Sequence, residues 1–157
     1  NMDILSKGCF LISREVYQKM IEQNNGGSII FVSSKNSLSA SKGASAYSVA
    51  KSSLLHLSRL IALEGSAYKI RSNVVNPDAV IQGSKIWKGD WKKQRAISNK
   101  ISINNVEEFY KNRSLLKESI LPEDIAEGIY FFASSKSKKS TGNIINVDGG
   151  NITSFTR

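Results

Sequence analysis

The chain has 157 residues, of which 40% are hydrophobic; this length suits one domain with a buried core and excludes wholesale disorder. Its 22 Lys and Arg residues outnumber its 13 Asp and Glu residues, so the formal net charge is +9 and its distribution has to be explained. The single cysteine excludes a disulfide scaffold and the lack of a long apolar run excludes a transmembrane helix, so we expect a cytoplasmic protein with no membrane partner.

Hydrophobic periodicity predicts helices that alternate with short, β-branched strands along the chain. Asn and Gly residues at 24–27 should end the first helix because both accept a left-handed cap, and Pro122 should begin the last one. In chain order we expect helix 3–23, strand 28–32, helix 46–67, strand 70–75, a helix from residue 122 and strand 143–147. This order predicts an α/β fold with a parallel sheet flanked by helices. Three strands make a narrow sheet, so we expect half of a larger one, with an edge to be covered.

Apolar residues three and four apart predict which faces of the helices are buried. In helix 46–67 we expect Leu54, Leu57, Leu60 and Ile61 to form the buried stripe. The lone histidine, His56, has no second histidine or carboxylate at ligand spacing, so we expect no metal site and a place at a helix–helix interface instead.

Residues 78–120 form a long, charged connection, which is typical of a functional lid or an insertion with its own helices. Residues 85–117 carry nine Lys or Arg residues and three Asp or Glu residues, with four aromatic residues among them. Such a mixture also occurs in surfaces that bind nucleic acid, which is therefore an alternative, but no nucleic-acid motif accompanies it. We expect a solvated surface on which Lys92, Lys93 and Arg95 face the solvent, and no nucleic-acid partner.

Ser34, Tyr47 and Lys51 form the strongest candidate for a catalytic site. Tyr47 and Lys51 are four residues apart on a predicted helix, so their side chains share one face. An ammonium near a phenol favours the phenolate, which would make Tyr47 a usable general acid and base. Ser34 follows a buried strand, where a rigid element can hold its hydroxyl towards a substrate oxygen.

The sequence around these residues resembles the short-chain dehydrogenase/reductase superfamily. The resemblance rests on Ser34, on the run Tyr47-Ser48-Val49-Ala50-Lys51 after twelve intervening residues, and on the blocks 27–34, 70–77, 122–126 and 141–150. The segments 34–36, 73–80 and 82–87 are similar to the dehydrogenase half of bifunctional rhamnulose-1-phosphate aldolase/alcohol dehydrogenases. In that branch a class II aldolase domain precedes the dehydrogenase, which processes lactaldehyde.

The resemblance implies a role for each candidate residue. Tyr47 would exchange a proton with the substrate oxygen, Ser34 would hydrogen-bond that oxygen, and Lys51 would hold the hydroxyls of the nicotinamide ribose. The implied cofactor is NAD, with NADP not excluded, and the implied substrate is a small alcohol or aldehyde. The implied cofactor-binding residues are Tyr47, Lys51, Pro77 and Val80, and the implied substrate-binding residues are Ser34, Lys35, Asn36, Gln82 and Trp87.

Four features depart from the family pattern. Asp78 and Gln82 stand where many members have Gly and Thr, and both fit the bifunctional branch better than the general family. Leu5 stands where the family often has an asparagine, and the chain has no Gly-rich strand-to-helix turn that could cradle a pyrophosphate. The resemblance therefore implies that residues 1–157 are the catalytic, carboxy-terminal half of a Rossmann-type short-chain dehydrogenase domain, whose amino-terminal dinucleotide-binding half is absent. Residues 81–120 would form a substrate lid. The expected partners of the chain are the missing amino-terminal half of the same protein and a second copy, bound through helices 3–23 and 46–67. The alternative is an inactive structural or association module.

Overall fold

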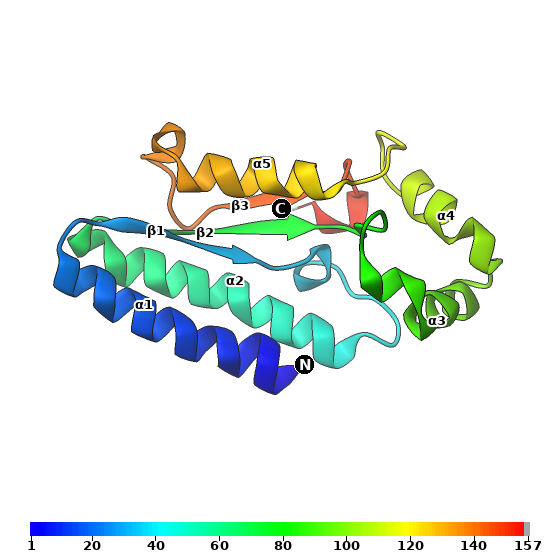
Figure 1. Cartoon of the computed structure of the whole chain (residues 1–157), viewed down its shortest axis with the longest axis horizontal. Coiled ribbons are helices and arrows are strands. Elements are labelled where there is room, and N and C mark those ends of the chain that lie inside the picture. Colours follow the sequence, from blue (N-terminus) through cyan, green and yellow to red (C-terminus); the bar gives the residue numbers. More distant parts are fainter. Residues whose placement is uncertain (156–157) are drawn as a thin grey trace.

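The computed structural model describes residues 1–155 and places a parallel sheet between two layers of helices (Figure 1). A π-helical segment, Met2–Gly8, runs directly into the first α-helix, so the predicted helix 3–23 is confirmed. The main elements are α1 (Cys9–Gln23), β1 (Gly27–Val32), α2 (Ser45–Gly65), β2 (Ile70–Pro77), α3 (Asp90–Asn99), α4 (Val106–Asn112), α5 (Pro122–Ala133) and β3 (Ile144–Val147). The α/β class and every predicted strand are therefore confirmed, and residues 156 and 157 lie outside the described part of the chain.

The sheet contains three parallel strands in the order β1-β2-β3. Helices α1 and α2 lie on one face and α5 lies on the other (Figure 1). The connection from β1 to β2 contains α2, and the connection from β2 to β3 contains α5. Both lead in the same direction across the sheet, so two right-handed crossovers would place α2 and α5 on the same face. One of the two crossovers must therefore be left-handed, against a right-handed preference of about 98%.

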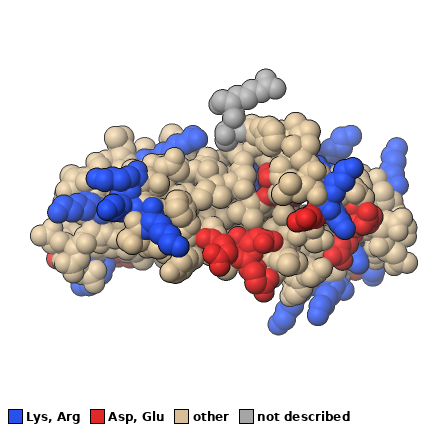
Figure 2. All heavy atoms as spheres, turned by 90° about the horizontal axis from the view of Figure 1, so that it is seen from above, with Lys and Arg blue, Asp and Glu red and all other residues tan. Residues whose placement is uncertain are grey.

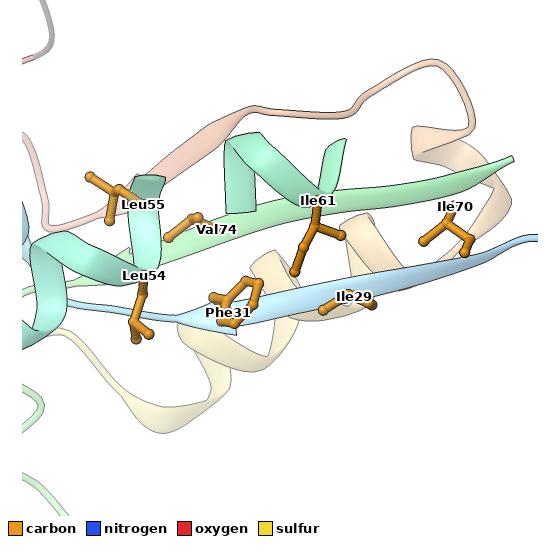
Figure 3. Close-up of a cluster of buried hydrophobic side chains, with 7 residues drawn as sticks. All are labelled: Ile29, Phe31, Leu54, Leu55, Ile61, Ile70 and Val74. Atoms are coloured by element: carbon orange, nitrogen blue, oxygen red, sulfur yellow. The ribbon is translucent and has the colours of Figure 1, made fainter. Parts of the chain in front are cut away.

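Alternating residues of the strands supply the two halves of the core. On the α1/α2 face, Phe31 and Val74 pack against Leu54 and Ile61 of α2 (Figure 3). On the α5 face, Val75 packs against Ile125 and Phe132, with Ile30 partly buried beside them. The strands are thus covered on both faces.

One helix stripe differs from the expectation. Leu54 and Ile61 are buried as predicted, but Leu60 is 42% exposed and Leu55 is buried in its place. The reason is the helical period: Leu60 lies about 120° around α2 from Leu54, outside the face that packs on the sheet, whereas Leu55 lies at the edge of that face. His56, expected at a helix–helix interface, is exposed in this chain.

The predicted helix ends are confirmed. Asn24 caps α1 in the left-handed conformation with φ of 51°, and its N–H donates to the carbonyl oxygens of Met20 and Ile21. At the start of α5, Pro122 occupies the first turn and the Asp124 carboxylate accepts a hydrogen bond from the Leu121 N–H at 2.8 Å.

The long connection after β2 carries α3 and α4 and lies beyond the carboxyl ends of β1 and β2 (Figure 1). Its two ends are tied together by a single parallel β-bridge between Val80 and Ile120. Within residues 1–155, no helix is long and apolar enough to cross a membrane, and no group of three His, Cys, Asp or Glu side chains could hold a metal ion.

Candidate active site

A cavity of about 580 Å³ lies at the carboxyl ends of the strands, between the sheet and the α3/α4 segment. Parallel α/β sheets bind ligands at this edge, because the loops that leave the strands converge there. The loop after β1 contributes Ser34 to its lining, the first turn of α2 contributes Tyr47, and the segment after β2 contributes Val80. Residues that are far apart in the sequence therefore meet around one hollow.

The backbone after β1 holds Ser34 in place. The Ser34 hydroxyl accepts a hydrogen bond from the Asn36 N–H at 3.2 Å, and the Ser34 carbonyl oxygen accepts one from the Ser37 hydroxyl at 2.6 Å. Ser37 also donates to the Asn76 side chain on β2 at 3.3 Å, which ties the loop to the neighbouring strand. Because the accepting bond leaves the Ser34 proton free, the hydroxyl can donate to a substrate oxygen in the cavity.

Tyr47 and Lys51 share one face of α2, as the spacing predicts. The Lys51 Nζ lies 5.9 Å from the centre of the Tyr47 ring, within reach of a cation–π contact. The Lys51 ammonium donates to the Val32 carbonyl oxygen at 2.8 Å, and the Lys51 carbonyl oxygen accepts from the Ser33 hydroxyl at 2.9 Å. These two bonds clamp α2 to the end of β1, so Ser34 and Tyr47 are held on neighbouring rigid elements.

The electrostatic state of Lys51 suits an anionic neighbour. Burial lowers the pKa of the Lys51 ammonium from its ordinary value, because the charged form loses water contacts. An anionic group beside Lys51 would therefore make a favourable charge contact with the ammonium. Lys51 also keeps two further N–H donors beyond its bond to Val32.

The end of β2 forms one side of the site. Pro77 is the last residue of β2 and pairs in register with Val147, while the next residue, Asp78, donates its N–H to the Val147 carbonyl oxygen at 3.1 Å. Val80 lines the cavity, whereas Pro77 is not among the lining residues. The Pro77–Val80 corner is thus fixed by the sheet and by the bridge to Ile120.

The structure brings together most of the predicted substrate-binding residues. Lys35, Asn36 and Trp87 line the cavity with Ser34. Gln82 does not; its amide donates to the Glu107 carboxylate at 3.3 Å and lines a smaller hollow nearby. Its position two residues beyond Val80 placed it near the site in sequence, but the turn that follows Val80 carries its side chain towards α4.

Trp87 both lines the cavity and fastens the segment that contains it. Its ring meets the Tyr110 ring edge to face at 5.1 Å, and Arg113 lies over Tyr110 at 4.5 Å. Trp91 also lines the cavity. Trp87 thus forms part of the cavity wall and also holds the α3/α4 segment together through its contact with Tyr110.

One prediction for this segment is wrong. Of the three residues expected at the solvent surface, only Lys93 is exposed; Lys92 is half-buried, and Arg95 is half-buried and lines the cavity. Its guanidinium lies 4.6 Å above the Trp91 ring, because residues four apart on α3 share one face. Sequence reasoning also missed Tyr110 and Arg113, which line the cavity from α4 and its end. The four-residue spacing of Trp91 and Arg95 could have indicated that Arg95 shares the helix face of Trp91. No comparable signal pointed to Tyr110 or Arg113.

The remaining basic residues do not gather into one surface on the face shown in Figure 2. There the Lys and Arg side chains lie in separate groups towards the two ends of the molecule, with acidic side chains between them and among those at the α3/α4 end. A protein that follows a phosphate backbone presents a continuous basic stripe, so this face gives no support to the nucleic-acid alternative.

The chain resembles known oxidoreductases over nearly its whole length. A family model described as Enoyl-(Acyl carrier protein) reductase matches residues 1–151. An uncharacterized oxidoreductase of Bacillus subtilis, YuxG, is 52% identical over 157 residues, which make up this whole chain and 23% of that protein. D-erythrulose reductase of Gallus gallus is 32% identical over 156 residues, 98% of this chain and 58% of that protein.

The solved structures show the same fold. Sorbitol-6-phosphate 2-dehydrogenase SrlD of Erwinia amylovora matches with a TM-score of 0.82 and 31% identity, over 90% of this chain and 55% of that one. The chain therefore spans little more than half the length of these relatives, and about a quarter of YuxG.

Proposed function

Because this chain belongs to the short-chain dehydrogenase/reductase superfamily, we propose that it is the catalytic part of an NAD-dependent enzyme that oxidises a small aldehyde or alcohol. The observation that carries the proposal is the meeting of Ser34 and Tyr47 around one cavity, with Lys51 clamped beside Tyr47. These three side chains supply a hydroxyl donor, a proton-transfer group and a cation, as transfer of a hydride from an oxygen-bearing carbon requires.

Each residue has a distinct task in the proposed reaction. With lactaldehyde, water adds to the carbonyl to give the hydrate, which has two hydroxyls on the reacting carbon. Ser34 would orient one hydroxyl and Tyr47, as phenolate, would take its proton; the bound cofactor would supply the acceptor for the hydride of the same carbon. The products are lactic acid, which ionises to lactate, and the reduced cofactor. Lys51 favours the phenolate before the transfer.

The described residues fit the nicotinamide end of the proposed cofactor. The two unused donors of Lys51 can bind ribose hydroxyls, and Val80 sits on a fixed corner beside the cavity. The cofactor supplies the hydride acceptor when it is bound. The 157 residues contain no Gly-rich turn for its pyrophosphate, so we propose that an amino-terminal half of the same protein supplies that part, together with the residues that select NAD or NADP.

We also propose that the complete protein is the bifunctional rhamnulose-1-phosphate aldolase/lactaldehyde dehydrogenase of the cytoplasm. Two observations support it. YuxG, which is 52% identical to this chain, is roughly four times longer than the matched segment, which leaves room for a further domain. D-erythrulose reductase and sorbitol-6-phosphate 2-dehydrogenase, by their names, act on small polyhydroxylated compounds.

The test is an assay of the complete protein. We expect it to reduce NAD when lactaldehyde is added and to release lactate in equal amount.

The isolated 157-residue chain is the control. Titration calorimetry of this chain with NAD should detect very weak binding or none, because phosphate contacts orient the cofactor. Micromolar affinity of the isolated chain for NAD would contradict the division of the cofactor site. A complete protein that turned over no aldehyde or alcohol would leave the structural-module alternative.

The segment 81–120 is proposed to be a substrate lid. Trp87 and Trp91 line the cavity from this segment, and closure over a substrate would exclude water from Ser34 and Tyr47.

We expect Trp87→Ala to raise KM or lower kcat of the complete enzyme by about tenfold, since one cavity wall and its Tyr110 contact are lost. Lys93→Gln, an exposed change on α3, is the matched control in the same steady-state assay. Equal kinetics of the two variants would remove the lid role of Trp87.

The proposed homo-oligomer forms through the helices 3–23 and 46–67. Both carry exposed apolar side chains, among them Ile12, 68% exposed, and Leu63, 74% exposed. Exposed apolar residues on adjacent helices are typical of an association surface, and the partner proposed here is a second copy. Light scattering of the complete protein in solution measures its oligomeric state.

A further inference from the structure

The lining of the active-site cavity is positively charged. It contains the cationic side chains of Lys35, Arg95 and Arg113, against the single carboxylate of Asp78. A site for a small neutral aldehyde needs no such excess, because Ser34 and Tyr47 already bind its oxygen. The positive charge therefore calls for a ligand group that the proposed chemistry has not yet used.

The one carboxylate is already occupied. Asp78 forms an ion pair with Arg113, with the Arg113 Nη2 3.1 Å from Oδ2 and 3.4 Å from Oδ1. The same Oδ2 accepts a hydrogen bond from the Asn151 amide at 2.8 Å. Arg113 and Asp78 thus neutralise each other, and the uncompensated charges of the lining are those of Lys35 and Arg95.

Lys35 and Arg95 both lack a protein anion. Among residues 1–155, no carboxylate forms an ion pair with either side chain. Lys35 is only 7% exposed, and its burial lowers the pKa of the ammonium from its ordinary value. Arg113 acts in the same direction, and the more weakly acting carboxylates of Asp78 and Asp148 oppose it. The buried Nε of Arg95 has no hydrogen-bond partner in the described part of the chain. A cation that is buried without an anion is costly, and an anion in the cavity that both side chains line would offset their charge.

From these contacts we infer that the cavity binds a carboxylate or phosphate group of the substrate or product against Lys35 and Arg95. The inference rests on the proposed function, because it concerns the ligand of that same site. Lys35 directly follows Ser34, so its ammonium belongs to the wall that holds the reacting oxygen. Two ligands have this chemistry: lactate, formed when an aldehyde is oxidised, and a phosphorylated aldehyde whose phosphate is remote from the reacting carbon.

A second cavity has to be distinguished from the first. A hollow of about 470 Å³ shares Lys35, Arg95 and Arg113 with the active-site cavity. Lys42 lines this second hollow but does not line the active-site cavity. An anion held from that side would not exclude the substrate. Competition with the substrate, and the effect of Lys42, therefore decide which side the anion occupies.

The experiment measures NAD reduction by the complete protein with two matched pairs of compounds. In the first pair, lactate should inhibit competitively against lactaldehyde, whereas lactamide, its neutral isostere, should not. In the second pair, glyceraldehyde 3-phosphate should have a higher kcat/KM than glyceraldehyde. A preference in the first pair identifies a carboxylate ligand, and a preference in the second identifies a phosphate ligand; either one supports the inference.

Variants assign the preference to the two cations. Arg95→Gln and Lys35→Gln should each weaken it by about 10-fold to 100-fold, the usual cost of losing a charged hydrogen-bond partner. Lys93→Gln, on the same helix as Arg95 but exposed, and Lys42→Gln should leave it unchanged. Should Lys35→Gln fail to fold, Arg95→Gln carries the test.

Three results would overturn the inference: no anion preference in either pair, a preference that persists in both cavity variants, or noncompetitive inhibition that Lys42→Gln relieves. In each case turnover of lactaldehyde would still support the proposed function, and loss of all turnover would instead count against that function. The two failures are therefore separable.

Discussion

Replacing Tyr47 with Phe should lower kcat of the complete enzyme by about 10²–10⁴-fold, the usual contribution of a positioned acid or base. The change removes only the phenolic oxygen that is proposed to take the proton. The ring, and with it the cation–π contact to Lys51 at 5.9 Å, would remain. The dissociation constant for NAD, measured by fluorescence titration, should therefore stay within a few-fold of the wild-type value.

Two further variants make this result specific. Tyr68→Phe removes the hydroxyl of an exposed tyrosine beyond the end of α2 and should leave kcat unchanged. Lys51→Ala should damage both kcat and NAD affinity, because its ammonium is proposed to serve the phenolate and the ribose together. Near-normal turnover of the Tyr47→Phe enzyme would show that another group moves the proton.

Replacing Phe132 with Ala should destabilise the domain by about 3–5 kcal/mol, the cost of a large cavity in a packed core. Phe132 is 1% exposed and packs with Val75 and Ile125 under α5. Its carbonyl oxygen accepts hydrogen bonds from Ser28 and Arg71, at 2.9 Å each, but these backbone contacts do not depend on the side chain. The expected loss is therefore a packing effect.

Urea unfolding of the complete protein measures this change as a lower midpoint of the transition that belongs to the dehydrogenase domain. The neighbouring Phe131→Ala is the matched control, because Phe131 is 37% exposed and should lose far less packing. Equal shifts for the two variants would mean that α5 does not cover a well-packed core.

The candidate catalytic residues could be placed together from the sequence because their geometry is local. The four-residue spacing of Tyr47 and Lys51 fixes their common face as soon as α2 forms, and Ser34 is placed by the strand before it. Strand positions were equally readable, since continuous β-branched runs such as 28–32 occur where both faces are covered. Helix ends followed from Asn24 and Pro122 for the same local reason.

The cavity wall could not be predicted in this way. Arg95 and Tyr110 reach the cavity only because α3 and α4 fold back over the ends of the strands, an arrangement that no short-range pattern encodes. Gln82 lies outside the cavity lining for the converse reason. It is close to Val80 in the sequence, but the turn after Val80 directs its side chain to Glu107. The exposure of Leu60 likewise depends on how widely α2 is covered by its neighbours.

The bridge between Val80 and Ile120 has a consequence for how such enzymes can diversify. The bridge holds the two ends of the segment 81–119 together, so this segment forms a closed loop that joins the rest of the fold at one place. The entropy of closing a loop grows only slowly with its length, so insertions or deletions between these anchors cost the scaffold little. Natural exchange of this stretch, or a graft made at Val80 and Ile120, could retune substrate choice while the hydride-transfer apparatus remains untouched.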